Sequence, residues 1–211
     1  VSYKSDKLSR LTGETKMINT VLAVAATYLC LATSASTNKP EGLVAEWNFD
    51  SEANDVARDS SGQGHAGKIF GATRIKHGNG FTLDLDGKDD YVDCGSNAAL
   101  GISGPVTVEA WLKPTRKAFG EATLFGTGMA GYVLTYYNTE ICIFYIGSGG
   151  NSVRGKLNLH AWNHVVASFD GQRMRMWVNG QKTGDRESKH KTYSPDGHIM
   201  IGMRGRADLP R

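Results

Sequence analysis

Carboxylates are the first candidates for chemistry, because clustered carboxylates with turn carbonyls suit a hard cation such as Ca²⁺. The loop after Phe49 offers Asp50, Asn54 and Asp59 as a candidate calcium site. A second acidic group does not have the spacing of an EF-hand loop, and we interpret it as a turn and a solvated strand face: Asp84, Asp86, Asp89, Asp90 and Asp93.

The six histidines are not placed for nucleophilic or zinc chemistry. None lies beside a nucleophile-elbow pattern, and no His/Cys pair has a zinc-site spacing. His164 has apolar neighbours, so we interpret it as a packed or turn-bonding residue. The six are His65, His77, His160, His164, His190 and His198.

Tyrosine rings can stack on sugar rings, although most aromatic residues of a β-sandwich pack in its core or at its edges. The candidates for carbohydrate contact are Tyr132, Tyr136 and Tyr137. Cys94 and Cys142 are the cysteines of the predicted folded domain. An even pair in an exported chain forms a disulfide or leaves two buried thiols, and both alternatives stay open.

The element best defined by pattern is a β-hairpin over residues 162–180. Asp170-Gly171 suits a tight turn, and a second turn follows at Asn179-Gly180. Because side chains of a strand alternate between its faces, the first strand places Trp162, His164, Val166 and Ser168 opposite Asn163, Val165, Ala167 and Phe169. The returning strand places Arg173, Arg175 and Trp177 opposite Met174, Met176 and Val178.

Further strands are predicted over residues 42–49, 68–70, 80–86, 105–113, 122–125, 132–136 and 141–146. Glycine-bearing turns separate them, and the chain contains 26 glycines in 211 residues. No segment carries a long apolar stripe at helical spacing. Short strands at regular intervals predict an all-β sandwich or barrel.

The net charge of the chain argues against polyanionic partners. The chain has 24 basic and 21 acidic residues, of which four basic and two acidic residues precede position 37. The remaining 20 and 19 leave a net charge near +1, which gives no electrostatic reason to bind nucleic acid or an anionic membrane.

Residues 1–36 match a secretory leader. Basic residues precede an apolar run over residues 21–31, and small residues follow it, so we expect cleavage before Ser36 and no membrane span afterwards. The alternative is a buried or membrane-anchoring helix. The true start is Val1 or Met17.

Six segments in order resemble the laminin-G-like jelly-roll domains of the concanavalin A-like lectin and glucanase superfamily. The resemblance covers residues 42–205. The segments are GLVAEWNFD, DSSGQGHAG, GNGFTLDLDGKDDYVDCG, PVTVEAWLKP, AWNHVVASFDGQRMRMWVNGQ and HIMIGMRG. The resemblance implies an antiparallel two-sheet jelly-roll sandwich. Relatives with this fold often bind calcium at the rim of the sandwich.

The resemblance also implies a closing strand that this sequence lacks, because the chain stops after residues 206–211. We therefore expect a truncated product or fragment, or a partner chain that supplies the strand. Glycoside hydrolases of this superfamily carry Glu-x-Asp-x-x-Glu, whereas Glu46 is followed by Asn48 and Glu109 by Trp111. The sequence thus predicts no catalysis.

The resulting prediction is a secreted or extracytoplasmic, non-catalytic recognition module that binds carbohydrate. The alternative is a structural or adhesive protein-binding domain, or a fragment of a larger exported protein. No cofactor other than calcium is expected.

Overall fold

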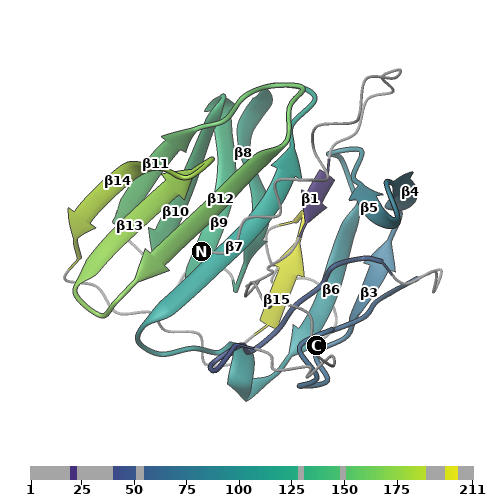
Figure 1. The fold of residues 1–211 in the computed structure, drawn as a ribbon, viewed down its shortest axis with the longest axis horizontal. Helices are drawn as coiled ribbons and strands as arrows, with labels where there is room; N and C mark the ends of the chain where they lie inside the picture. Colours follow the sequence, from purple (N-terminus) through teal and green to yellow (C-terminus); the bar gives the residue numbers. More distant parts are fainter. Residues whose placement is uncertain are drawn as a thin grey trace, which may run out of the picture.

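Two antiparallel β-sheets face each other in the computed structural model, which describes residues 20–22, 40–50, 55–127, 131–147, 151–188 and 198–203 (Figure 1). The order in the seven-stranded sheet is β14 (Gln181–Glu187), β13 (Arg173–Val178), β12 (Asn163–Phe169), β7 (Val106–Lys113), β1 (Thr20–Leu22), β5 (Gly80–Asp84) and β4 (Thr73–His77).

The second sheet has eight strands. Their order is β11 (Ser152–Lys156), β10 (Ile141–Ile146), β9 (Tyr132–Thr139), β8 (Ala118–Gly126), β15 (His198–Ile201), β6 (Tyr91–Ser96), β3 (Gly67–Phe70) and β2 (Val56–Ala57). One 3-10 helix, η1 (Ala98–Leu100), follows β6. The predicted all-β, two-sheet antiparallel class is confirmed.

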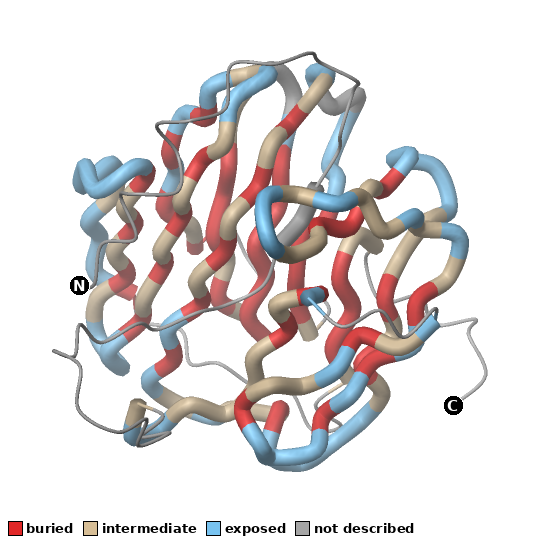
Figure 2. Tube along the Cα trace, turned by 45° about the vertical axis from the view of Figure 1, so that its right-hand side comes forward, coloured by how far each residue is buried: buried red, intermediate tan, exposed pale blue. Residues whose placement is uncertain are grey.

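The core lies between the sheets because alternate residues of their strands are apolar. In β12, every second residue from Asn163 to Phe169 is buried and the residues between are partly exposed. Strands β7 and β13 alternate in the same way. Figure 2 shows this alternation along the strands. The period of two predicted from the sequence thus sets which side chains enter the core.

The turn between β13 and β14 has the backbone conformation expected of an Asn-Gly dipeptide. Asn179 and Gly180 both have positive φ, at 52° and 78°. This conformation matches the twist of a tight hairpin and is easiest for Asn-Gly. The Asn179 side chain also accepts a hydrogen bond from the backbone N–H of His164, at 2.9 Å.

The prediction of a strand over residues 42–49 is wrong. Trp47 and Phe49 are buried as expected, but none of the described strands pairs with this segment. Its backbone is held by other groups instead: the N–H of Glu46 donates to Asp59 Oδ1 at 3.0 Å. Alternation therefore describes which side chains are buried here, but a strand also needs a neighbouring strand.

Strand β1 lies within the predicted leader. Thr20–Leu22 pairs with three residues of β7 and with Asp84 of β5. The rest of residues 1–36, and residues 206–211, lie outside the described part of the chain, so the leader and the truncated terminus remain predictions. Among the described residues, no helix has the length and hydropathy needed to span a bilayer.

Candidate functional site

Three of the four tryptophans belong to the outer side of the seven-stranded sheet. Trp111 and Trp177 alternate with buried core residues of β7 and β13, so their side chains point away from the core. Trp162 precedes buried Asn163 at the start of β12 and has the same phase. All three are partly exposed. We call Trp162, Trp111, Trp177, Glu109 and His164 the tryptophan face.

Strand register brings these residues together. His164 of β12 lies directly opposite Trp111 of β7. Val166 lies between Glu109 of β7 and Trp177 of β13. Because neighbouring strands are about 4.8 Å apart, the whole group lies within a span of three strands, which is the width of a small ligand.

Glu109, His164 and Trp111 form one interacting group. His164 Nε2 lies 2.7 Å from Glu109 Oε1, and the two side chains are 27% and 19% exposed. The imidazole stacks on the Trp111 indole with ring centroids 4.7 Å apart and an interplanar angle of 22°. Carboxylate and imidazole are thereby fixed beside an aromatic surface, which combines hydrogen bonding with stacking.

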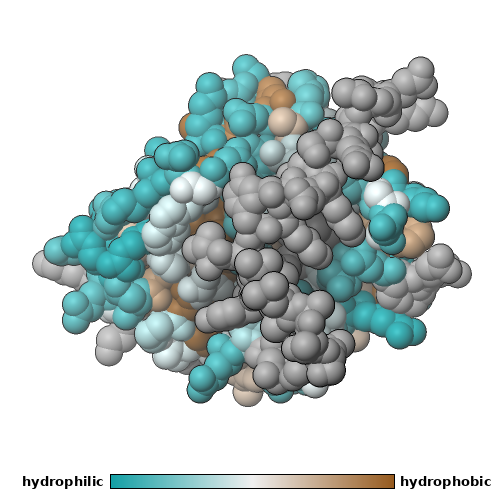
Figure 3. All heavy atoms as spheres, viewed as in Figure 1, coloured by the Kyte–Doolittle hydropathy of each residue, from teal (hydrophilic) through white to brown (hydrophobic). Residues whose placement is uncertain are grey.

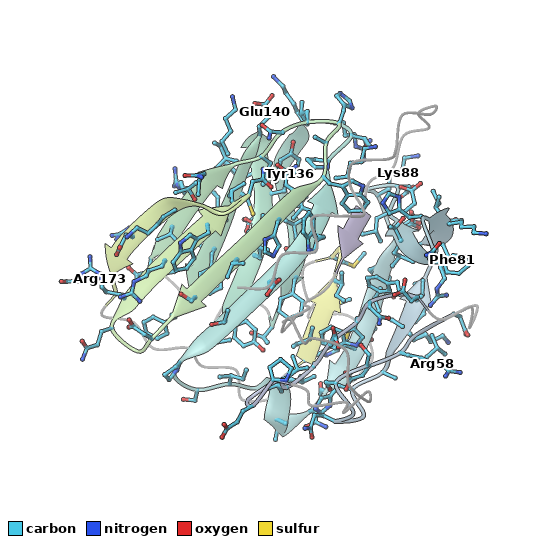
Figure 4. All side chains as sticks on the ribbon, viewed as in Figure 1. Arg58, Phe81, Lys88, Tyr136, Glu140 and Arg173 are labelled. Carbon is cyan, nitrogen blue, oxygen red and sulfur yellow. The ribbon has the colours of Figure 1, made fainter. Side chains whose placement is uncertain are left out.

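Ion pairs border this face along β13. Arg175 Nη1 lies 2.7 Å from Asp170 Oδ2, and Arg173 contacts both Asp185 and Glu187. Hydrogen bonds from the backbone N–H groups of Arg173 and Gln172, and then Arg175, lower the pKa of Asp170 to about 2. The Arg173 side chain points outward from one end of β13 (Figure 4), where hydrophilic residues gather over β13 and β14 (Figure 3).

His77 and Trp162 extend the face toward β4. Their ring centroids are 5.2 Å apart. Burial, and then the charge of Lys113, lowers the pKa of His77 below its usual value. His77 is therefore a neutral ring at neutral pH, able to donate and accept hydrogen bonds.

The prediction of sugar contact is wrong for two of the three tyrosines. Tyr132 and Tyr136 lie in the core, where their hydroxyls donate to the carbonyls of Leu100 (2.8 Å) and Arg116 (3.0 Å). Burial, then Glu140 and Cys142, raises the pKa of Tyr136 to about 12. Tyr137 is 39% exposed on the other face of β9 and stays a prediction.

The disulfide alternative for Cys94 and Cys142 is also wrong in this structure. Both are free, buried thiols, and burial raises the pKa of each. They lie on β6 and β10 of one sheet, with three strands between. That separation is several times the Cα–Cα distance that a disulfide allows.

Two of the three candidate calcium ligands lie in the described part of the chain, and each accepts backbone hydrogen bonds. Asp50 Oδ1 accepts the backbone N–H of Phe81 at 3.0 Å, and Asn54 lies outside the described residues. Asp59 accepts three backbone N–H groups, as described below. The described carboxylates that do gather within 4.8 Å are instead those of Asp86, Asp89 and Asp90. Calcium at Asp50, Asn54 and Asp59 stays a prediction, which a calcium-dependent rise in Tm would support.

The role of Asp59 gives a prediction about acid stability. Its carboxylate accepts the backbone N–H groups of Glu46, Ser61 and His65 at 2.8–3.0 Å. Burial alone would raise its pKa, but a hydrogen bond from the Ser61 side chain, together with these backbone hydrogen bonds, outweighs burial and lowers it. Its stabilisation is therefore full above the unfolded-state pKa and is lost as the pH falls through the lower folded-state pKa.

Asp59→Asn is accordingly expected to lower the free energy of unfolding at pH 7 by about 1.5 kcal/mol, a modest value because the group is partly exposed. In urea titrations between pH 7 and pH 2, the difference from the wild type should shrink below about pH 4. Exposed Asp89→Asn is the matched control. A difference that does not change with pH would contradict this role.

A cavity of about 650 Å³ opens at one end of the sandwich. Its walls include Val44, Trp47, Val106, Phe125 and Phe169, and Glu41 and Asp170 also line it. The cavity is mainly apolar, unlike the tryptophan face, and both β7 and β12 contribute to its walls.

Together these features define a lectin-like β-sandwich. The family model described as the concanavalin A-like lectin/glucanases superfamily matches residues 86–210, more than half of the chain, and the chain belongs to this family. None of the curated proteins compared with the chain matches it.

Solved structures share the fold at low identity. Domain 4 of AbnA, an extracellular arabinanase of Geobacillus stearothermophilus solved with arabinotriose, is 17% identical, with a TM-score of 0.59 over 77% of this chain and 84% of that one. The binding domain of Paraclostridial Mosquitocidal Protein 1 is 13% identical, with a TM-score of 0.61 over 76% and 44%. Trypanosoma rangeli sialidase is 19% identical, with a TM-score of 0.53 over 75% and 27%. The chain thus spans less than half of the latter two.

The sequence alternation already places Trp111 and Trp177 opposite a row of apolar residues, but no tryptophan was among the predicted site residues. Trp111 and Trp177 fall at positions that alternate with the apolar residues of their strands, whereas His164 lies in a strand with apolar residues on both faces. A large aromatic residue at an outward position was the available signal. Their proximity depends on the pairing of β7, β12 and β13, which a single sequence does not specify.

Proposed function

We propose that this protein is a secreted, non-catalytic carbohydrate-recognition module that binds sugar on the tryptophan face. The observation that carries the proposal is the Glu109–His164–Trp111 group, with Trp177 one strand beyond. Aromatic rings supply stacking surface, while the carboxylate and imidazole select hydroxyl groups. Arabinotriose in the AbnA domain supports carbohydrate as the ligand class.

The non-catalytic part of the proposal rests on the partners of Glu109. A retaining glycosidase needs two carboxyl groups about 5 Å apart. The side chain paired with Glu109 is His164, and the residues across β12 and β13 at that level are Val166 and Trp177. This arrangement suits holding a sugar rather than cleaving it. Release of reducing ends from polysaccharides would overturn this part.

The proposal that the protein is secreted rests on the secretory leader predicted over residues 1–36. The competing function is a structural or adhesive domain that binds protein. A glycan array separates the two, because only the first gives a sugar signal that depends on aromatic side chains.

Trp111→Ala and Trp177→Ala are each expected to weaken binding to an array-positive glycan at least tenfold, a loss of about 1.4 kcal/mol. Tyr137→Ala removes an exposed ring from the other sheet and tests the remaining tyrosine prediction: if the tryptophan face is the site, this variant should bind like the wild type. Isothermal titration with arabinotriose and 3′-sialyllactose gives the first affinities. A glycan signal retained by both tryptophan variants would contradict the proposed surface.

A further inference from the structure

Lys113, at the end of β7, is a cation without a counter-ion on the outer side of the seven-stranded sheet. It is partly exposed, and its side chain has the same phase as those of Glu109 and Trp111. None of the described residues forms a hydrogen bond or an ion pair with its ammonium group. The acidic residue of the same row, Asp84, lies beyond Thr20, so its strand is about 10 Å away.

The other charged side chains of β7 and β13 all have partners. The two strands carry four charged residues, and three of these are paired. Glu109 contacts His164, Arg175 contacts Asp170, and Arg173 contacts both Asp185 and Glu187. Because opposite charges in contact largely cancel, Lys113 leaves this end of the face with an uncompensated positive charge.

Aromatic rings flank Lys113. The antiparallel register places Asn163 opposite Leu112, so the next position along the two strands brings Trp162 beside Lys113. The His77 ring lies against the Trp162 indole at an interplanar angle of 54°. The charge of Lys113 also reaches His77, since after burial it is the second cause of the lowered pKa of that ring. Two rings set at an angle therefore stand next to one ammonium group.

We propose that this end of the tryptophan face binds an acidic sugar, with the Lys113 ammonium group donating to its carboxylate or sulfate. The inference rests on the proposed function and narrows its ligand from carbohydrate to anionic carbohydrate. A sugar ring stacked on Trp162 or Trp111 holds its substituents beside Lys113, where an ammonium group is a strong donor to an anionic oxygen. The near-neutral net charge of the chain is no obstacle, because one unpaired cation suffices for one acidic group.

Lysine at this position selects the charge of the acidic group rather than its shape. An ammonium group is a compact charge with three rotatable donors, and it lacks the planar fork by which arginine matches a carboxylate. Carboxylated and sulfated sugars are therefore both expected to bind.

The test compares sugars that differ in charge, by isothermal titration of the full chain. The pairs are 3′-sialyllactose with its methyl ester, cellobiouronic acid with cellobiose, and 3′-sulfolactose with lactose. The first two pairs test a carboxylate and the third tests a sulfate. We expect the acidic member to bind about fivefold more tightly, the ratio that an ion pair at a partly exposed site contributes. The ratio should fall toward one in about 0.5 M NaCl, because salt screens exposed charges.

Three variants assign the preference to Lys113. Lys113→Met removes the charge but keeps an unbranched side chain, and its ratio should be close to one. Lys113→Arg keeps the charge and should keep the ratio. Lys76→Met, at an exposed lysine of β4, changes the net charge equally and is the matched control, so its ratio should equal that of the wild type.

The outcomes separate this inference from the proposed function. Equal binding of acidic and neutral sugars that is lost in Trp111→Ala would overturn the inference and leave the function standing. A preference for acidic sugars that persists in Lys113→Met, or that disappears equally in Lys76→Met, would also overturn the inference alone. No binding of any of these sugars, together with a blank glycan array, would overturn both.

Discussion

Trp47→Ala is expected to lower the free energy of unfolding by about 4 kcal/mol, the typical cost of removing a buried tryptophan. Trp47 is 1% exposed, and its indole packs against Phe125 with ring centroids 6.0 Å apart. Its Nε1–H donates to the carbonyl of His65 at 2.7 Å. The substitution therefore creates a cavity and leaves a buried carbonyl without its donor. Urea unfolding measured by circular dichroism gives the difference.

Trp47→Phe separates the two contributions, because it keeps an aromatic ring and removes the N–H. Its expected cost is about 2 kcal/mol, from the lost hydrogen bond and a smaller cavity. Trp162→Ala is the matched control at a partly exposed tryptophan and should cost less than Trp47→Ala. A loss below 1 kcal/mol for Trp47→Ala would mean that the segment 42–49 does not anchor the core.

Asn163→Ala should cost about 3 kcal/mol, because it leaves several buried polar groups without partners. Asn163 is fully buried at the start of β12. Its Oδ1 accepts the backbone N–H of Asn158 at 2.8 Å, and its Nδ2 donates to the carbonyls of Asn158 and Ala161 at 2.9 and 2.8 Å. The side chain thus fixes the turn that leads into β12.

The matched control is Asn158→Ala, since the interactions of Asn158 with Asn163 use only its backbone and its side chain is exposed. This variant should unfold within about 0.5 kcal/mol of the wild type. Differential scanning calorimetry of the two variants compares them directly. Equal losses of Tm would contradict a specific role for the Asn163 amide.

Local pattern predicted much of the fold. The alternation of β13 predicted Met176 in the core, whereas both faces of β12 carry apolar residues and the sequence did not show which of them is buried; the structure buries Val165 and leaves Val166 partly exposed. The Asn179-Gly180 turn was also predictable from the sequence, because positive φ at two successive positions favours that dipeptide. These features depend only on neighbours in sequence.

Properties that depend on distant neighbours were not predicted. Residues 132–137 alternate between Tyr132, Leu134 and Tyr136 on one side and Val133, Thr135 and Tyr137 on the other, so composition does not show which side faces the core. Segment 42–49 has a strand pattern without a described partner strand. Pairing of Thr20–Leu22 between β5 and β7 joins segments about 60 and 90 residues apart, which local periodicity does not encode.

The central claim is that glycan binds on the outer side of the seven-stranded sheet. The most direct measurement follows the four tryptophan indole N–H signals of ¹⁵N-labelled protein during titration with arabinotriose, 3′-sialyllactose and any array-positive glycan. We predict saturable shifts of the Trp111 and Trp177 signals with at least one of these sugars, while the signal of buried Trp47 stays fixed. Saturable binding that leaves the Trp111 and Trp177 signals in place, or no binding to any of these glycans, would contradict the account.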